Sequence, residues 1–410
     1  MKILIMISWR NLRRNKRRTL VILSSIATGV FAIIFTMGFM NGFAVQMVDN
    51  TIGSSIGHAA INFRGFRDDM KPEHSFEITD DIISALNDRE ATAWAPRVRI
   101  QAMARSSKTS RGVIITGIDP VKEKGVSRLY EYLINDGYSR WLESSGSDEV
   151  LISKGMAKRL DLIAGDRLVI MLQDSNAEIA GFALRIAGIY ESPMENFDRV
   201  MIFTGIEKLQ EMTGINRKIS EITILTASKE AASGAADRIA GKIKNSDLEV
   251  LSWQEMAPAL VSSIKLFDSM MYVFFMIIFV TIIFSVANTL IMAVMERFHE
   301  IGVMKSIGTR PSAVFFLIMF EAVNLGILGL TAGVAAGGAL IYGLSIWGID
   351  LSIFVESMRI WGTGSIIYPS IKPMDLAAAF SIVFVTTITA ALYPAVKAAR
   401  IKPLEALKQI

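Results

Sequence analysis

Residues 20–43 read LVILSSIATGVFAIIFTMGFMNGF, and residues 270–294 read MMYVFFMIIFVTIIFSVANTLIMAV. Both stretches exceed the roughly 20 apolar residues that a helix needs to cross the hydrocarbon core of a bilayer. Residues 314–344 and 376–396 qualify by the same criterion. The first stretch is longer than the apolar core of a cleaved signal peptide, about 7–15 residues, so we interpret it as a retained helix. The sequence therefore predicts four transmembrane helices.

The composition of the whole chain supports a membrane protein without metal or thiol chemistry. Of 410 residues, 51% are apolar and 20% are charged, whereas soluble domains carry roughly 25% charged residues. The absence of cysteine excludes disulfides, thiol nucleophiles and cysteine metal sites. Only three histidines are present, far apart in the sequence. We therefore expect no metal site.

The distribution of lysine and arginine predicts the orientation, because these residues are enriched on the cytoplasmic side. Seven lysine and arginine residues precede the first span, where no acidic residue is present. Three more basic residues lie at 295–313, and four lie in the tail at 397–410. The 345–375 loop carries two basic residues against three acidic ones. We therefore expect both termini and the 295–313 loop in the cytoplasm, and residues 44–265 outside it.

The predicted fold class is an α-helical membrane protein with four spans and a large extracytoplasmic α+β domain inserted between the first and second. The first 19 residues interleave Ile3, Ile7 and Trp9 with the basic cluster, which is typical of an interfacial helix on anionic lipid. The predicted parts are an elbow helix at 1–19, a first span at 20–43, the external (periplasmic) domain at 44–265, a second span at 270–294, a cytoplasmic loop with a coupling helix at 295–313, a third span at 314–344, a short external loop at 345–375, a fourth span at 376–396 and a cytoplasmic tail at 397–410.

Alternating and continuous apolar runs predict the elements of the external domain. Ser153 and Thr204 stand where helix N-caps belong, and Gly165-Asp166 is typical of a turn into a strand. The predicted strands are 58–63, 97–104, 112–118, 149–152, 167–172, 182–190, 199–203 and 221–225. The predicted helices are 80–87, 153–160, 205–213 and 229–243.

We find no catalytic constellation in the sequence. The carboxylates of Asp148-Glu149 are adjacent, as are those of Asp68-Asp69, and sequence neighbours diverge in direction on a strand or loop. Ser24-Ser25 lie inside the first span, where hydroxyls usually bond their own backbone or a neighbouring helix. We therefore predict no catalytic residues and no enzyme activity in this chain.

The most informative cytoplasmic motif is ERFHEIGVMKSIG at residues 296–308. In a helix, Ile301, Met304 and Ile307 can share one face while the charged residues remain polar. Two interpretations stay open: a solvated hairpin with membrane anchors, or a surface helix that docks into another protein and transmits its motion. Under the second, the coupling residues are Glu296, Arg297, Glu300, Ile301, Gly302, Met304, Lys305, Ile307 and Gly308.

Spans one and two are rich in phenylalanine and methionine, which together form a deformable apolar surface. This surface is compatible with ordinary lipid contact and with a groove that receives a substrate. The candidate groove residues are Phe35, Phe39, Met40, Asn41, Phe43, Phe267, Met270, Met271 and Phe274.

The third span repeats glycine at Gly329, Gly333 and Gly337, a spacing that lets helix backbones approach closely. Packing within the chain and contact with a second copy both fit this pattern. Glu321 is nearly alone as an ionisable residue within the spans, which disfavours a proton-coupled carrier. The chain also lacks the G-x-x-x-x-G-K-[ST] phosphate loop, so nucleotide hydrolysis, if involved, belongs to a separate subunit.

Several stretches together resemble the FtsX-like, MacB-type permease family, also called type VII ABC transporters. They are SWRNLRRNKRR at 8–18, VLISKGMA at 150–157 followed by Gly165-Asp166, the 296–308 motif, Tyr393-Pro394-Ala395 and RIKPLEAL at 400–407. The resemblance covers essentially the whole chain. Within this family, residues 40–43 and 57–61 are similar to the lipoprotein-releasing permeases.

This resemblance implies a permease subunit in the bacterial inner membrane that extracts acylated lipoproteins and passes them to a periplasmic carrier. It also implies a cytoplasmic ABC ATPase dimer that binds ATP and Mg²⁺, and a second permease, identical or related. We expect no cofactor in the chain itself and no nucleic acid partner. Displacement of the 296–308 helix would reach the external domain through the stiff spans.

Three other functions stay open. The first is that of the macrolide-exporter branch, which moves periplasmic substrates outward. The second is a mechanotransmission subunit that activates a periplasmic hydrolase, as in FtsX-type members. The third is a membrane-anchored sensor or scaffold without transport.

Overall fold

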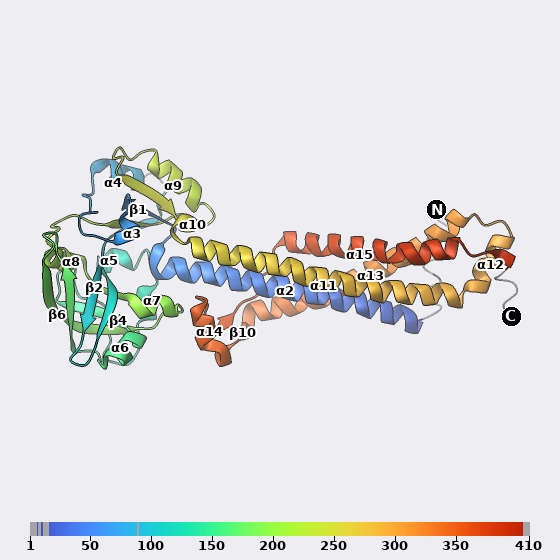
Figure 1. Cartoon of the computed structure of the whole chain (residues 1–410), viewed down its shortest axis with the longest axis horizontal. Helices are drawn as coiled ribbons and strands as arrows, with labels where there is room; N and C mark the ends of the chain where they lie inside the picture. The colour runs from blue at the N-terminus through green and yellow to red at the C-terminus, as the bar shows by residue number, and fades with distance from the viewer. Residues whose placement is uncertain (1–5, 7–9, 11–15, 88–89, 405–410) are drawn as a thin grey trace. The chain divides into compact units, whose positions relative to one another are not determined.

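The computed structural model describes residues 6, 10, 16–87 and 90–404 and divides into two compact units (Figure 1). The membrane unit comprises residues up to 44, 264–350 and 366 onward, and the sheet unit comprises 45–263 and 351–365. Most of the elbow helix predicted at 1–19, and the end of the tail from 405, lie outside the described residues.

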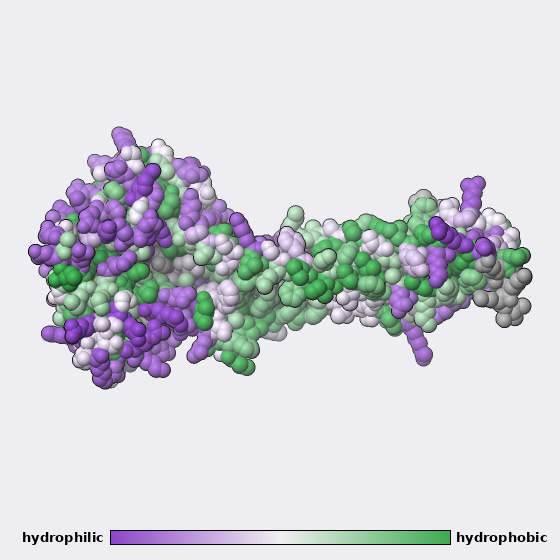
Figure 2. Space-filling model, in the orientation of Figure 1, coloured by the Kyte–Doolittle hydropathy of each residue, from purple (hydrophilic) through white to green (hydrophobic). Residues whose placement is uncertain are grey.

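The membrane unit is mainly helical, and among its described residues four helices are long and apolar enough to cross a bilayer. Figure 2 shows hydrophobic surface along these helices, whereas the surface of the sheet unit is largely hydrophilic. The spanning helices are α2 (Lys16–Thr51), α11 (Pro258–Glu296), α13 (Pro311–Trp347) and α15 (Pro373–Ala399). The remaining elements are α12 (Phe298–Ser306) and the paired short strands β10 (Ile349–Asp350) and β11 (Ile366–Ile367).

The spanning helices are longer than the apolar stretches that predicted them. Helix α11 has 39 residues, which corresponds to about 58 Å at 1.5 Å per residue, against a hydrocarbon core of about 30 Å. Its first turns hold Ser262, Lys265 and Asp268, which are polar but compatible with a helix. Helices α2 and α11 each contribute residues to both units.

The three glycines of α13 lie against α2 of the same chain. A Cβ atom on Gly333 would lie 2.5 Å from Cβ of Val30, and one on Gly329 would lie 2.6 Å from Cγ2 of Ile26. At Gly337 the nearest atom, on Ile34, would be 3.1 Å away. The structure thus places this small-residue face within the chain, where it allows α13 and α2 to approach closely.

The sheet unit is built on one mixed sheet. Among the described residues, nine strands run in the order β3-β7-β4-β6-β5-β2-β8-β1-β9. Strand β2 also pairs with β3, which closes six of these strands into a ring. The strands are β1 (Ala59–Phe63), β2 (Ala93–Arg105), β3 (Ser110–Ile118), β4 (Glu149–Ser153), β5 (Arg167–Gln173), β6 (Ile179–Tyr190), β7 (Met201–Gly205), β8 (Glu221–Leu225) and β9 (Leu248–Ser252).

Short helices connect and cover these strands. They are the π-helix η1 (Ile52–Ile56), α3 (Phe66–Asp69), α4 (Asp80–Asn87), α5 (Pro120–Glu123), the 3₁₀ helices η2 (Leu129–Tyr132) and η3 (Ser352–Phe354), α6 (Lys154–Leu160), α7 (Glu195–Val200), α8 (Ile206–Thr213), α9 (Ala232–Ala240), α10 (Trp253–Met256) and α14 (Val355–Ile360).

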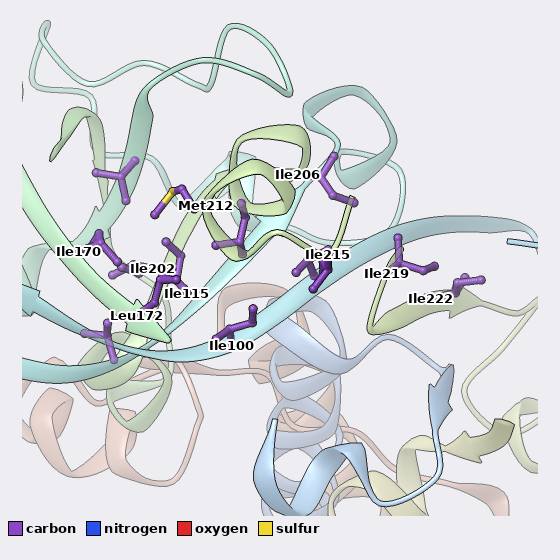
Figure 3. Close-up of a cluster of buried hydrophobic side chains, with 14 of the residues drawn as sticks. Ile100, Ile115, Ile170, Leu172, Ile202, Ile206, Met212, Ile215, Ile219 and Ile222 are labelled. Atoms are coloured by element: carbon purple, nitrogen blue, oxygen red, sulfur yellow. The ribbon is translucent and has the colours of Figure 1, made fainter. Parts of the chain in front are cut away.

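The hydrophobic core of the sheet unit is formed by inward-facing residues of the strands and of α8. Ile100, Ile115 and Ile202 on β2, β3 and β7 meet Leu209 and Met212 of α8, and all five are buried (Figure 3). At about 25 cal/mol per Å² of apolar surface, such burial is the main favourable contribution to folding. The alternating pattern that predicted the strands therefore corresponds to core positions.

Some local predictions are confirmed and others are wrong. Ser153 caps α6, because its Oγ accepts a hydrogen bond from the N–H of Met156 at 3.1 Å. Thr204 is not a cap: α8 begins after Gly205, and Thr204 Oγ1 instead donates to the carbonyl of Glu149 across the sheet at 2.7 Å. Helix α7 occupies 195–200, where a strand was expected to start at 199, and strand β9 was not predicted.

The segment 351–365, predicted as part of a short external loop, belongs to the sheet unit. Arg359 of α14 donates from Nη2 to Oδ2 of Asp198 at 2.6 Å and from Nη1 to Oε1 of Glu191 at 3.1 Å. Asn50 Nδ2 donates to the carbonyl of Gly362 at 2.9 Å. Burial raises the pKa of the Asp198 carboxyl to about 6. The charge-assisted hydrogen bonds of Arg359 hold the segment to Asp198 of α7 and to Glu191, which precedes α7.

Replacing Gly333 by leucine tests the close approach of α13 and α2. Because a Cβ there would overlap Val30 and the carbonyl of Ala27, at 2.5 and 2.7 Å, we expect Gly333→Leu to lower the yield of folded protein and its melting temperature in detergent. Gly338→Leu is the matched control, because nothing lies within 4 Å of its Cβ position. Equal melting temperatures for the two variants would contradict the packing.

Candidate functional site

A cavity of about 600 Å³ lies between α2, α11 and α15 in the membrane unit. Methionine, phenylalanine and aliphatic side chains make up most of its wall, so it offers an apolar environment with deformable walls. Its volume lies in the range of typical ligand pockets. The lining residues are Met37, Asn41, Asp268, Met271, Tyr272, Phe275, Met276, Phe279, Asp375, Ala378 and Ile382.

The polar groups of this cavity come from Asn41, Asp268, Asp375 and the hydroxyl of Tyr272. Asn41 Nδ2 on α2 donates a hydrogen bond to Oδ2 of Asp375 at 2.6 Å. The same carboxylate oxygen accepts the backbone N–H of Lys372 at 2.8 Å, as part of the cap of α15. The cavity can therefore hold an apolar chain along its walls and contact a polar group beside Asn41.

A row of phenylalanines follows one face of α2. Phe31, Phe35, Phe39 and Phe43 are four residues apart, and successive ring centroids are 6.4–6.5 Å apart. Phe43 is buried and meets Phe267 of α11 edge to face at 5.6 Å. Such contacts contribute about 0.5–1.5 kcal/mol beyond their buried area, so the Phe43–Phe267 contact helps to hold α2 against α11.

The structure separates the predicted groove residues into groups. Asn41 and Met271 line the cavity, and the predicted Phe35, Phe39, Phe43 and Phe267 belong to the aromatic row. Met270 and Phe274 are exposed on α11 and do not line it, and Met40 is half-buried. The contribution of α15 was missed, because only the packed structure brings Asp375, Ala378 and Ile382 to this place.

Hydroxyl groups line a second cavity, of about 420 Å³, between α2 and α11. Ser24 and Ser25 each donate to the carbonyl of Val21, at 3.0 and 2.9 Å, as expected for hydroxyls within a span. Ser285 of α11 donates to Ser25 at 3.0 Å. The hydroxyls are thus satisfied by backbone and by one helix–helix contact.

At the opposite end of α11, helix α12 is tied to the rest of the membrane unit by two basic residues. Arg297 is buried, and its Nη1 lies 3.3 Å from Oε2 of Glu321 on α13, while its Nε donates to Oε2 of Glu300 at 3.1 Å. Lys305 Nζ donates to the carbonyls of Ala399 and Ile401, at 2.9 and 2.5 Å. Arg297 and Lys305 therefore connect α12 to α13 and to the end of α15.

Apolar packing reinforces these polar contacts. Ile301 is buried in a cluster with Val294, Val314 and Ala398, which come from α11, α13 and α15. The neighbouring Gly302 is buried as well. A displacement of α12 must therefore be shared with three spanning helices, because packed interiors are not freely deformable.

The arrangement corrects part of the predicted amphipathic pattern. Ile307 was expected on the same apolar face as Ile301, but it is 80% exposed, because α12 ends at Ser306 and the chain turns there. Arg297 and Lys305, predicted as coupling residues, contact other parts of the chain itself. Glu321, the ionisable residue noted within the third span, is paired with Arg297.

Exposed side chains in α12 and at its two ends include those of Glu296, Glu300, Val303 and Ile307, and we call these four residues the outer face of α12. Of the other predicted coupling residues, Met304 is half-buried, and Gly308 follows at φ +98° in the turn. Two carboxylates beside two aliphatic side chains form a surface suited to a protein partner, since interfaces combine apolar anchors with a polar rim.

The described residues contain no group of three histidine, aspartate or glutamate side chains close enough to hold a metal ion. His58 Nδ1 accepts the N–H of Thr226 at 3.0 Å, and partial burial lowers the His58 pKa. His74 Nδ1 lies 3.0 Å from Asp69. Both histidines thus have structural partners.

The sequence matches two protein families that together cover most of its length. The MacB-like periplasmic core domain matches residues 19–242. The FtsX-like permease C-terminal domain matches residues 272–403. The first match contains the strands of the sheet from β1 to β8, and the second contains most of α11 and all of α12, α13 and α15.

Relatives of known name share this organisation. The chain is 23% identical over 419 residues to the lipoprotein-releasing system transmembrane protein LolC of Neisseria meningitidis, with 98% of each chain covered. It is 21% identical over 435 residues to the corresponding LolE of Haemophilus influenzae, again with 98% of each covered. It is 32% identical over 124 residues to the macrolide export ATP-binding/permease protein MacB of Chlorobium luteolum, which covers 30% of this chain and 16% of that one.

Substitution of Glu321 tests the attachment of α12 to α13. Glu321→Leu leaves the Arg297 guanidinium buried without its α13 partner, which costs about 3 kcal/mol or more. We expect a clear fall in the melting temperature of the purified protein, which the double variant Arg297→Met, Glu321→Leu largely reverses.

Glu300→Ala is the control for this pair, because Glu300 is half exposed and such surface pairs contribute about 0–1 kcal/mol. If the single and double variants melted at the same temperature, the buried pair would not be the attachment.

Proposed function

The chain belongs to the family of permeases that join a MacB-like periplasmic core domain to an FtsX-like C-terminal half, and from this we propose that it is the membrane subunit of an ABC transporter that releases lipoproteins from the inner membrane. A separate ATPase supplies the energy. A periplasmic carrier receives the acylated protein.

Similarity along the entire chain carries this proposal. The relatives named as lipoprotein-releasing system proteins match 98% of this chain and 98% of their own length. The match to the macrolide exporter covers 30% of the chain. The four spans and the inserted α+β domain agree with an inner-membrane protein that carries a periplasmic domain.

The apolar cavity between α2, α11 and α15 is the proposed acyl-chain site. Removing an acyl chain from the bilayer costs about 0.8 kcal/mol per CH₂ group, so several chains cost tens of kcal/mol unless an apolar surface receives them. The methionine and phenylalanine walls provide such a surface. The hydrogen-bonded Asn41–Asp375 pair provides polar groups for the region where the acyl chains join the peptide.

The outer face of α12 is the proposed contact with the ATPase. The sequence contains no phosphate loop, so ATP hydrolysis belongs to the partner in this account. The basic residues beside the spans favour a cytoplasmic position for α12 and for both termini. Because α12 is attached to α11, α13 and α15, motion of the ATPase reaches the spans, and α2 and α11 continue into the sheet unit.

Efflux of a small molecule is the second candidate function, favoured by the 32% identity to the macrolide exporter over 124 residues. The same cavity would then receive a free amphiphile instead of a protein-linked lipid. The two functions differ in what a reconstituted complex releases, an acylated protein or a small molecule.

Filling the cavity tests the acyl-chain site. Ala378 lines the cavity, whereas Ala377 on the same helix is exposed and does not line it. We expect Ala378→Trp to reduce ATP-dependent release of an acylated lipoprotein from proteoliposomes by at least tenfold, because the indole occupies the space of the chain. Ala377→Trp is the control and should release normally. Equal release by both variants would show that the cavity is not the acyl-chain site.

Introducing a charge on the outer face of α12 tests the contact with the ATPase. We expect Ile307→Asp to abolish co-purification of the ATPase without changing the melting temperature, because the side chain is 80% exposed. Ile163→Asp is the control, an exposed isoleucine of the sheet unit at 69%. Retention of the ATPase by Ile307→Asp, measured by stoichiometry after purification, would contradict the docking face.

A further inference from the structure

The short helices η3 and α14, between α13 and α15, expose large apolar side chains. Ile353 is 93% exposed, and Phe354, Ile360 and Trp361 are each about half exposed. Soluble surfaces carry scattered apolar residues, but contiguous patches mark an interaction site. We call these four residues the apolar patch of α14.

The apolar patch and the attachment to α7 belong to the same short segment, 353–361. Ile353 and Phe354 belong to the 3₁₀ helix η3, and Ile360 and Trp361 stand at the end of α14. The Arg359 side chain is directed to the sheet unit, where its guanidinium donates to Asp198, Glu191 and the carbonyl of Ser192. The segment is thus bound to the sheet unit through Arg359, while the side chains of the apolar patch remain half to fully exposed.

The position of this segment between two spanning helices indicates that the apolar patch lies near the membrane surface. Helix α13, a spanning helix, ends at Trp347, six residues before Ile353, and an extended chain covers at most about 20 Å over that length. Helix α15 begins at Pro373, twelve residues after Trp361. Trp347 and Tyr368, both exposed, are residue types enriched at membrane–water interfaces.

The charges of the segment indicate the kind of membrane contact. Between 351 and 361 the charged side chains are Glu356 and Arg359, so the segment has no net charge, and Arg359 is already paired. Attraction to anionic lipid is therefore not the driving force. Insertion of apolar side chains at the headgroup boundary is sufficient for an amphipathic helix to lie in the interface.

We propose that η3 and α14 form a lipid-contacting foot of the sheet unit: the apolar patch lies in the outer-leaflet interface, while Arg359 fastens the foot to Asp198 and Glu191. The foot requires only that α13 and α15 cross the membrane, and it holds whether the cargo is a lipoprotein or a small molecule. It adds an attachment of the sheet unit to lipid besides the helices α2 and α11.

The natural absence of cysteine allows a direct test with single cysteine substitutions in the full-length protein. Ile353→Cys and Phe354→Cys are labelled with an environment-sensitive fluorophore and reconstituted in phosphatidylcholine bilayers. We expect blue-shifted emission, strong quenching by nitroxide-bearing lipid, weak quenching by iodide, and no change on adding salt.

Glu356→Cys is the matched control on the same helix, since Glu356 is exposed but not part of the apolar patch. Val121→Cys is the aqueous reference in the sheet unit, at 81% exposure. We expect the ratio of lipid quenching to iodide quenching to be several-fold higher at 353 and 354 than at 356 and 121. Equal ratios at all four positions would overturn the proposal, as would labels at 353 that approach each other between two copies while shielded from lipid.

Discussion

A guanidinium group taken out of water must keep a counter-charge, and this constraint positions helix α12. Arg297 stands at the junction of α11 and α12 and reaches Glu321 on α13, while Lys305 at the other end reaches the carbonyls at the end of α15. Without these contacts α12 would be a loose hairpin between two spans. With them it is part of a packed junction of three spanning helices, so a force on its outer face is a force on the membrane unit.

The two units differ in how they bury their apolar side chains. In the membrane unit, glycines replace larger residues where α13 meets α2, and apolar side chains remain exposed because lipid is their solvent. In the sheet unit, isoleucines of several strands fill an interior that folds without disulfides. The cavity beside Asn41 and the apolar patch of α14 are two places where the chain offers apolar surface that its own packing does not cover.

Much of the fold could be predicted from the sequence because its signals are local. Apolar stretches of more than about 20 residues predicted the spanning helices. The alternation of apolar and polar residues predicted most strands. Ser153 predicted a helix cap that the structure confirms. The predictions failed where a partner lies far along the chain. The pairing of Arg297 with Glu321 was not predicted, because Glu321 is 24 residues away. The contribution of α15 to the cavity was not predicted either, because nothing local in Asp375 or Ala378 indicates α2. Strand β9 was missed because its pairing with β1 is a long-range choice.

Purification of the full-length protein from its native membrane, followed by mass spectrometry of bound proteins and lipids, tests the central claim most directly. The account predicts a stoichiometric ABC ATPase together with an acylated lipoprotein held by the complex. A stable complex that contains the ATPase and a small amphiphile but never an acylated protein, or a protein that carries no ATPase at all, would contradict it.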